Sequence, residues 1–220
     1  MTICRVDSLS KHYTMGETVK PLDNVSFSLE AGDFVAIEGP SGIGKSTLLY
    51  TIAGLLEPSE GRIYLFEKDT ARLSEKEKTR MRAEKIGFVF QEAILFQALT
   101  VKENLFFPQK FNKKKDPAQI AYLLDKFGLT DRINFLPYQL SVGQRRRLVI
   151  ARALLNEPML LLADEPTNDL NEAWIEIIME SLADVSKKGG AVIMVTHNAQ
   201  LAMQAGKRYY LQEGKLAAIN

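Results

Sequence analysis

The chain has 220 residues, and its 28 Lys and Arg residues against 27 Asp and Glu residues leave a formal net charge of +1. This near balance excludes a strongly basic nucleic-acid-binding protein and a polyanionic tail protein, so we expect no nucleic acid among the partners. Hydrophobic residues make up 46% and charged residues 25% of the chain, which is ordinary for a soluble globular domain, with or without a subdomain.

The one cysteine, Cys4, rules out an intramolecular disulfide and makes a cysteine-based metal site unexpected. A reducing, cytoplasmic setting fits this composition. Residues 1–7 lack the apolar stretch of a secretory signal, and no apolar run comes near the roughly 18 residues of a spanning helix. We therefore expect another component to provide the anchor if the protein works at a membrane.

Strand and helix signals alternate along the first part of the chain. The predicted strands are short apolar or alternating runs at residues 25–29, 34–37, 61–66 and 86–90. Ser26 and Ser28 face away from the apolar side chains of the first run, which indicates a half-buried strand. One helix is predicted over residues 45–53, after a Gly-rich turn, and another begins at the capping-box sequence of residues 74–77.

Helical signals dominate residues 92–158. Four apolar side chains recur with the spacing of one helix face: Ile120, Leu123, Leu124 and Phe127. Residues 145–155 contain no helix breaker and predict a further helix. Residues 113–115 are three lysines, too few to indicate a binding patch, and are interpreted as part of a solvated loop.

Strand signals return near the end of the chain. Buried strands are predicted over residues 159–163 and 191–195, and residues 208–219 predict a hairpin. The helix between the two buried strands has one apolar face, made of Trp174, Ile178, Leu182 and Val185. We interpret Trp174 as a core residue and not as a platform for a ligand.

The alternation of strands with helices predicts an α/β fold built on a parallel sheet. The helical stretch interrupts that alternation and is interpreted as an insertion. We expect one domain over residues 1–220, with a nucleotide-binding core made of 1–91 and 159–220 and a helical subdomain made of 92–158.

Residues 39–47 match the phosphate-loop pattern G-x-x-x-x-G-K-[ST], with a predicted strand before it and a predicted helix after it. Glycines let the backbone wrap closely with its N–H groups turned inward, and the helix directs the positive end of its dipole at the same point. Lys45 adds a charge for the β- and γ-phosphates, and the Ser46 hydroxyl is a ligand for Mg²⁺. An ordinary glycine turn is the alternative, but the context favours phosphate binding. The residues expected to bind phosphate are Gly39, Ser41, Gly42, Gly44, Lys45, Ser46 and Thr47.

Two acids and a histidine follow the predicted buried strands, at the strand ends where such sheets bind ligands. Beside a phosphate loop, Asp164 is a candidate to hold Mg²⁺ through water and Glu165 is a candidate to polarise the attacking water. The alternative is a pair of solvated loop acids. His197 ends a strand expected to lie parallel to the one carrying Asp164, which favours a γ-phosphate contact over a purely structural role.

Ser141 and Gln144 have capping-box spacing, so a plain helix start is one interpretation of this segment. The same geometry also suits an anion, because a serine hydroxyl, the Gly143 N–H and a helix N-terminus lie together there.

Taken jointly, these motifs resemble the nucleotide-binding subunits of ATP-binding cassette (ABC) transporters, over essentially the whole chain. The features that carry the resemblance are, in chain order, the phosphate loop, Gln91, Leu-Ser-Val-Gly-Gln at residues 140–144, Asp164, Glu165 and His197. The resemblance implies the ABC ATPase fold: a P-loop NTPase (RecA-like) parallel-sheet core with an antiparallel β subdomain and an inserted α-helical subdomain. It also implies ATP and Mg²⁺ as ligands.

The resemblance assigns roles that the residues alone do not. Tyr13 would stack on adenine, and Gln91 would be a metal ligand beside Ser46 and Asp164. The catalytic residues would be Glu165, His197, Gln91 and Lys45. Ser141, Gly143 and Gln144 would cap the ATP held by a second subunit.

A subgroup is also indicated, because residues 13–17, 86–91 and 162–167 are similar to the lipoprotein-releasing and macrolide-export ATPases. Two positions depart from the family pattern. Val142 stands where the family usually has glycine, and Asn171 stands where it has aspartate. We expect Val142 to be tolerated unless its φ angle must be positive, and we expect Asn171 to slow the basal turnover.

Residues 93–99 are unusually apolar for a segment that leaves a nucleotide site, and Phe106 and Phe107 follow soon after. Packing within the helical subdomain is one explanation. The resemblance implies another, in which a groove beside this loop receives a short cytoplasmic helix of a membrane protein. Leu95 and Phe96 are the contacts expected there.

We therefore expect an ATPase subunit that dimerises around ATP and Mg²⁺, as a homodimer, and drives an integral-membrane transport partner. Through that partner it would lie at the inner face of the membrane, in an export or lipoprotein-extraction system. The rival hypothesis is a non-transport cassette that acts as a mechanical regulator, for example in cell division. A phosphate-loop kinase is a further alternative, but it would not need the motif of residues 141–144.

Overall fold

The computed structural model describes residues 1–111 and 116–219, so the loop expected at residues 113–115 lies outside the described residues. The strands are β1 (Thr2–Met15), β2 (Glu17–Glu30), β3 (Phe34–Glu38), β4 (Glu60–Leu65), β5 (Lys68–Asp69), β6 (Ile86–Val89), β7 (Leu160–Asp164), β8 (Ala191–Val195), β9 (Lys207–Gln212) and β10 (Lys215–Ile219). The helices are α1 (Lys45–Ile52), α2 (Glu75–Lys85), α3 (Val101–Gln109), α4 (Pro117–Lys126), α5 (Val142–Leu154), α6 (Glu172–Lys187) and α7 (Ala199–Ala202).

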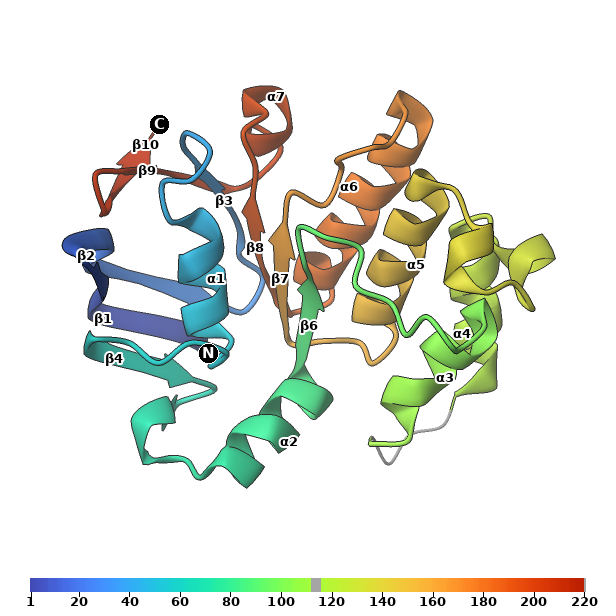
Figure 1. Ribbon diagram of the computed structural model, residues 1–220, viewed down its shortest axis with the longest axis horizontal. Coiled ribbons are helices and arrows are strands. Elements are labelled where there is room, and N and C mark those ends of the chain that lie inside the picture. Colours follow the sequence, from blue (N-terminus) through green and yellow to red (C-terminus); the bar gives the residue numbers. More distant parts are fainter. Residues whose placement is uncertain (112–115, 220) are drawn as a thin grey trace.

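Two sheets organise the chain (Figure 1). The larger sheet has the strand order β10-β9-β3-β8-β7-β6. Strands β9, β3, β8, β7 and β6 are parallel to one another, and β10 pairs antiparallel with β9 in a C-terminal hairpin. The smaller sheet, with the order β2-β1-β4-β5, is antiparallel throughout. The predicted parallel sheet, the antiparallel β subdomain and the terminal hairpin are therefore confirmed.

The parallel strands are buried on both faces, and alternate side chains enter two separate cores. In β3, Val35 and Ile37 pack toward α1 and the antiparallel sheet, whereas Phe34 and Ala36 pack toward α5 and α6. Figure 1 shows the resulting layers, with the antiparallel sheet and α1 on one side of the parallel sheet and the longer helices on the other. Cys4 lies in the core on the α1 side, where burial raises the pKa of its thiol to about 12.

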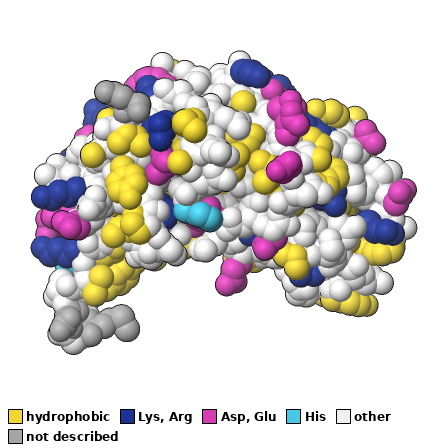
Figure 2. Space-filling view, turned by 90° about the horizontal axis from the view of Figure 1, so that it is seen from above, with side chains coloured by type: hydrophobic (Ala, Val, Ile, Leu, Met, Phe, Trp, Pro, Cys, Tyr) yellow, Lys and Arg dark blue, Asp and Glu magenta, His cyan; other side chains and the backbone are white. Residues whose placement is uncertain are grey.

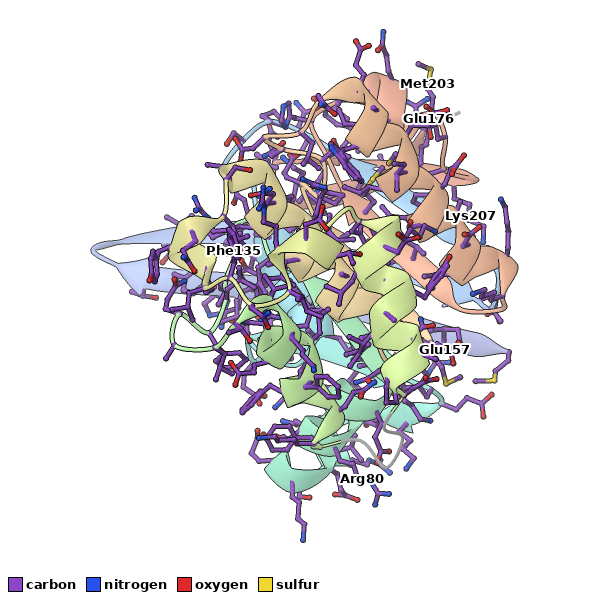
Figure 3. The ribbon with its side chains drawn as sticks, turned by 90° about the vertical axis from the view of Figure 1, so that its right-hand side faces the viewer. Arg80, Phe135, Glu157, Glu176, Met203 and Lys207 are labelled. Atoms are coloured by element: carbon purple, nitrogen blue, oxygen red, sulfur yellow. The ribbon has the colours of Figure 1, made fainter. Side chains whose placement is uncertain are left out.

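The segment between β6 and β7 is helical in its described part and covers one side of the molecule (Figure 3). Phe135 and Glu157 are seen on opposite sides of this layer. The predicted apolar face of Ile120, Leu123, Leu124 and Phe127 is buried and belongs to α4 and its C-cap. Because α5 shares a core with the parallel sheet, the division at residues 92–158 stays our interpretation.

Two local predictions need correction. The helix predicted over residues 145–155 begins three residues earlier, at Val142, because Ser141 is its N-cap and completes a capping box. The prediction that Trp174 is a core residue is wrong. Its side chain is only partly buried, and its ring stacks against the guanidinium of Arg147, 3.8 Å from the ring centroid. Among the described residues, no helix is long and apolar enough to span a membrane.

Candidate functional site

The candidate site lies at the carboxyl ends of β3, β7 and β8, which point to the same edge of the parallel sheet (Figure 1). Figure 2 looks onto this edge from above and shows a histidine flanked by charged and apolar side chains near its middle. A pocket of about 310 Å³ opens here. Its walls are formed by Tyr13, Val19, Pro21, Ser41, Gly42, Gly44, Lys45, Ser46, Thr47, Gln91, Asp164 and Glu165.

The phosphate loop between β3 and α1 depends on glycine backbone conformations. Gly44, with φ at 116°, is the N-cap of α1, and a Cβ there would approach the Pro21 carbonyl oxygen to 2.5 Å. Within residues 1–111 and 116–219, no side chain caps this helix start. The first N–H groups of α1 therefore remain available at the pocket, which is the arrangement that binds phosphate at helix N-termini.

Lys45 lies at the base of this loop with only 7% of its surface exposed. Its Nζ donates hydrogen bonds to the carbonyl oxygens of Gly39 at 2.7 Å and Pro40 at 2.8 Å. Burial lowers the pKa of this ammonium, and the nearby carboxylates of Glu165 and Asp164 oppose the change. The lysine is thus a buried cation held inside the phosphate loop.

Asp164 ends β7 and is 1% exposed. Burial raises the pKa of this carboxyl, while a hydrogen bond from Ser46 and the charge of Lys45 act in the opposite direction. Its Oδ2 atom is buried and has no hydrogen-bond partner among the described residues. A buried carboxylate oxygen without a partner is costly. Together with the Ser46 hydroxyl it forms an oxygen donor set that fits Mg²⁺.

Glu165 follows Asp164 in a left-handed backbone conformation, with φ at 47°. Its amide N–H donates to the Val195 carbonyl oxygen at 2.9 Å, which fixes the turn against β8. Its Oε1 lies 2.8 Å from His197 Nδ1, and its Oε2 is buried without a hydrogen-bond partner in the described part of the chain. One carboxylate oxygen is therefore held by the histidine and the other remains able to accept a proton.

The predicted site residues divide into two groups. Tyr13, Gln91 and the acids line the pocket with six of the seven phosphate-loop residues, and Gly39 lies behind them as a hydrogen-bond acceptor for Lys45. His197 does not line the pocket, although its ring contacts Glu165. Val19 and Pro21 also line the pocket but were not predicted, because no local sequence signal marks the start of β2 as a pocket wall.

Ser141, Gly143 and Gln144 also lie outside this pocket. Ser141 Oγ accepts a hydrogen bond from the Gln144 N–H at 3.2 Å, and Gln144 Oε1 accepts one from the Ser141 N–H at 2.8 Å. The segment therefore forms a plain helix start within one chain, one of the two interpretations given above.

The two positions that depart from the family pattern both occupy helix starts. Val142 is the first residue of α5 and does not have a positive φ, so its Cβ is accommodated without strain. Asn171 is the N-cap of α6 and accepts a hydrogen bond from the Trp174 N–H at 3.2 Å. An aspartate would serve equally well as a cap, so the capping role does not explain the amide.

Comparisons with known proteins agree on one family. The family model described as ABC transporter matches residues 22–168. The chain is 40% identical over 217 residues to the lipoprotein-releasing system ATP-binding protein LolD of Aquifex aeolicus, covering 97% of this chain and 96% of the relative. It is 41% identical over 214 residues to the macrolide export ATP-binding/permease protein MacB of Bdellovibrio bacteriovorus, covering 95% of this chain and 32% of the relative.

A solved structure gives the same result at the level of the fold. The dimeric structure of an ATP-binding cassette in a post-hydrolysis state, bound to ADP and Pi, superposes with a TM-score of 0.92. It is 36% identical to this chain, and the match covers 99% of both chains.

Proposed function

This chain belongs to the ABC transporter family, and on that premise we propose that it is the ATP-hydrolysing subunit of a transport system of the export or lipoprotein-releasing type. The observation that carries the proposal is the single pocket that joins Lys45 and Ser46 to the buried acids Asp164 and Glu165. The direct test is phosphate release from ATP by the purified chain, measured with and without Mg²⁺. No release under either condition would contradict the proposal.

In the proposed complex, the ring of Tyr13 stacks on the adenine and the phosphate loop surrounds the phosphates. Tyr13 is 37% exposed at the pocket wall, which supports a role for its ring in contacting a base, and the Lys11 ammonium lies 5.0 Å from the ring centroid. Ser46, Gln91 and Asp164 would hold Mg²⁺, for which the unpartnered Asp164 oxygen supplies an acceptor. When bound, Mg²⁺ neutralises charge on the β- and γ-phosphates.

Glu165 is the proposed base for the attacking water. Its Oε2 is the free oxygen, while His197 Nδ1 holds Oε1 and so orients the carboxylate. His197 is proposed to act on the reaction through this contact with Glu165. Its side chain is 66% exposed, so it is also accessible to the γ-phosphate of a bound ATP. This orientation by a neighbour is the common arrangement of a general base.

We expect an ATP-dependent homodimer, because the phosphate loop and the segment 141–144 do not meet within one chain. The solved relative described above is itself dimeric. Sedimentation of Glu165→Gln with ATP and Mg²⁺ should show dimers, and the same variant without nucleotide should be largely monomeric. Ser141→Arg is the matched variant, since it should block the dimer while leaving nucleotide binding by the monomer unchanged. A strict monomer at high protein concentration would contradict this assembly.

The partner-binding surface is proposed to be an apolar hollow of about 400 Å³ beside the loop that follows Gln91. It is lined by Ala83, Phe90, Ile94, Leu95, Phe96, Phe107, Pro108, Phe111 and Arg152. MacB is described as an ATP-binding/permease protein, and this pairing supports a membrane partner for the present chain. A short apolar helix of such a partner would suit a hollow lined mainly by apolar side chains. Through such a partner the subunit would lie at the inner face of the membrane.

The two residues expected to contact the partner, Leu95 and Phe96, both line this hollow but differ in exposure. Leu95 is only 7% exposed and belongs to the subdomain core, whereas Phe96 and Ile94 are 43% and 52% exposed. A charge at Leu95 would damage folding and would not test docking.

Phe96→Glu is expected to lower co-purification of an integral-membrane protein from detergent-solubilised membranes by about tenfold, because burying a carboxylate in an apolar contact costs free energy. Basal ATP hydrolysis should stay unchanged. Tyr122→Glu is the matched control, since Tyr122 is also an exposed aromatic of the helical layer but lies outside the hollow. Undiminished co-purification by folded Phe96→Glu would place the docking surface elsewhere.

A further inference from the structure

Two arginines of α5 fasten the loop that leaves the nucleotide pocket after β6. Arg152 donates a hydrogen bond to the Ile94 carbonyl oxygen at 2.6 Å, and the buried Arg146 holds the part of the loop next to the pocket. Arg146 is 4% exposed, and its guanidinium donates hydrogen bonds to the carbonyl oxygens of Phe90, at 2.8 Å, and of Gln91. Figure 1 shows the segment after β6, in green, crossing beside α5. Two adjacent carbonyls on one guanidinium define the position of the main chain, because the fork of donors is planar and rigid.

Arg146 also lies within electrostatic reach of the catalytic acids. Burial lowers the pKa of its guanidinium, and Asp169, Asp164 and Glu165 act against that change. The guanidinium stays protonated at any working pH. Its Nε has no hydrogen-bond partner in the described part of the chain. The arginine therefore keeps a buried positive charge between the Gln91 loop and the pocket acids.

The neighbouring Arg147 provides a natural contrast. It is also buried, at 8% exposure, and its Nε likewise has no hydrogen-bond partner among the described residues. Its guanidinium, however, turns away, donating to the Phe127 carbonyl oxygen and stacking on Trp174. Burial lowers the pKa of Arg147, and no carboxylate of the described residues opposes this change. Two adjacent buried arginines of one helix thus serve different parts of the fold.

We propose that Arg146 is a positioning residue for ATP hydrolysis, acting through Gln91. By holding the Gln91 main chain, it sets where the Gln91 side chain lies in the pocket. It also joins this loop to α5, which has Ser141 as its N-cap and Gly143 in its first turn, so that nucleotide-dependent movement of the loop moves the start of α5 in the same chain. The proposal rests on the proposed function, because Gln91 acts there on the metal and the reacting phosphate.

The test compares Arg146→Met with Arg147→Met, which removes an equally buried charge from the adjacent position. In Arg146→Met, kcat at saturating ATP and Mg²⁺ should fall about tenfold or more, because small displacements of catalytic groups have large effects on rate. The Kd of a fluorescent ATP analogue should change by less than about threefold. Hydrogen exchange of residues 90–94, measured without nucleotide, should accelerate about tenfold. Arg147→Met should change neither kcat nor this exchange.

Gln91→Ala and the double variant Arg146→Met/Gln91→Ala show whether Arg146 affects kcat through Gln91 or independently of it. If Arg146 acts through Gln91, the double variant should be no slower than the slower single variant. The proposal would be overturned if the kcat losses of the two single variants multiplied in the double variant. It would also be overturned if Arg146→Met and Arg147→Met lost kcat equally at matched thermal stability. If Arg146→Met does not fold, Arg146→Lys takes its place, since it keeps the charge but loses the fork and should show the same exchange and kcat changes. An inactive wild-type chain would contradict the proposed function, whereas the exchange measurement would still decide whether Arg146 holds the loop.

Discussion

Glu165→Gln is expected to lower ATP turnover by about 10²–10³-fold and to leave the Kd for ATP within about twofold of the wild-type value. The amide has almost the same shape as the carboxylate and can keep the contact with His197 Nδ1, which is 2.8 Å from Glu165 Oε1. It cannot accept a proton at the position of Oε2, the oxygen that has no hydrogen-bond partner among the described residues. Chemistry should therefore be lost while binding is kept.

The measurement is phosphate release for kcat, with a fluorescent ATP analogue for the Kd. Glu172→Gln is the control, because Glu172 is an exposed acid in the first turn of α6 and does not line the pocket. It should have the wild-type rate. Turnover at the wild-type rate in Glu165→Gln would show that another group takes the proton. His197, which contacts Glu165, would then be the candidate base.

Lys45→Ala is expected to weaken ATP binding by about 100-fold, the opposite pattern to that of Glu165→Gln. Lys45 brings a buried positive charge into the phosphate loop, and alanine can neither replace that charge nor hold the carbonyl oxygens of Gly39 and Pro40. With the charge gone, Asp164 and Glu165 would face the phosphates without the counter-charge that Lys45 supplies from the loop. The loss should thus appear in the Kd before any chemical step.

Isothermal titration with ATP and Mg²⁺ measures this loss directly, and thermal stabilisation by ATP gives an independent reading. Lys76→Ala serves as the control, since Lys76 is an exposed lysine of α2 far from the pocket walls. ATP affinity within a factor of two of the wild type in Lys45→Ala would remove the phosphate-loop assignment.

Much of this molecule follows from interactions between near neighbours in the chain. The phosphate loop, the capping box at Ser74 and the turn that joins β9 to β10 each depend on a few consecutive residues, and all lie where the sequence places them. The doubly buried strands were also predictable, because a short continuous apolar run such as residues 34–37 suits a strand covered on both faces. The fold class was accordingly accessible from the sequence, and so was the loop between β3 and α1 that lines the pocket.

Side-chain environments were less accessible, because they depend on how separate elements pack. Leu95 and Phe96 are adjacent and both apolar, yet one is buried and the other exposed. Trp174 shares a predicted helical face with core residues. It lies in the first turn of α6, however, where this face contacts Arg147 and not the core. The periodicity of a sequence predicts which way a side chain points on its helix, but it does not predict which other element packs against that side chain.

Contacts between distant parts of the chain were decided by the tertiary structure alone. Glu165 and His197 are 32 residues apart and meet because β7 and β8 are parallel neighbours whose ends share one edge. Arg146 reaches the carbonyl oxygen of Gln91 across 55 residues, since α5 packs beside the end of β6. Local motifs were enough to indicate which residues could carry phosphate chemistry, because each motif depends only on neighbours in the chain. Which of them contact one another, and which arginine supports them, was decided by the packing of helices on the sheet.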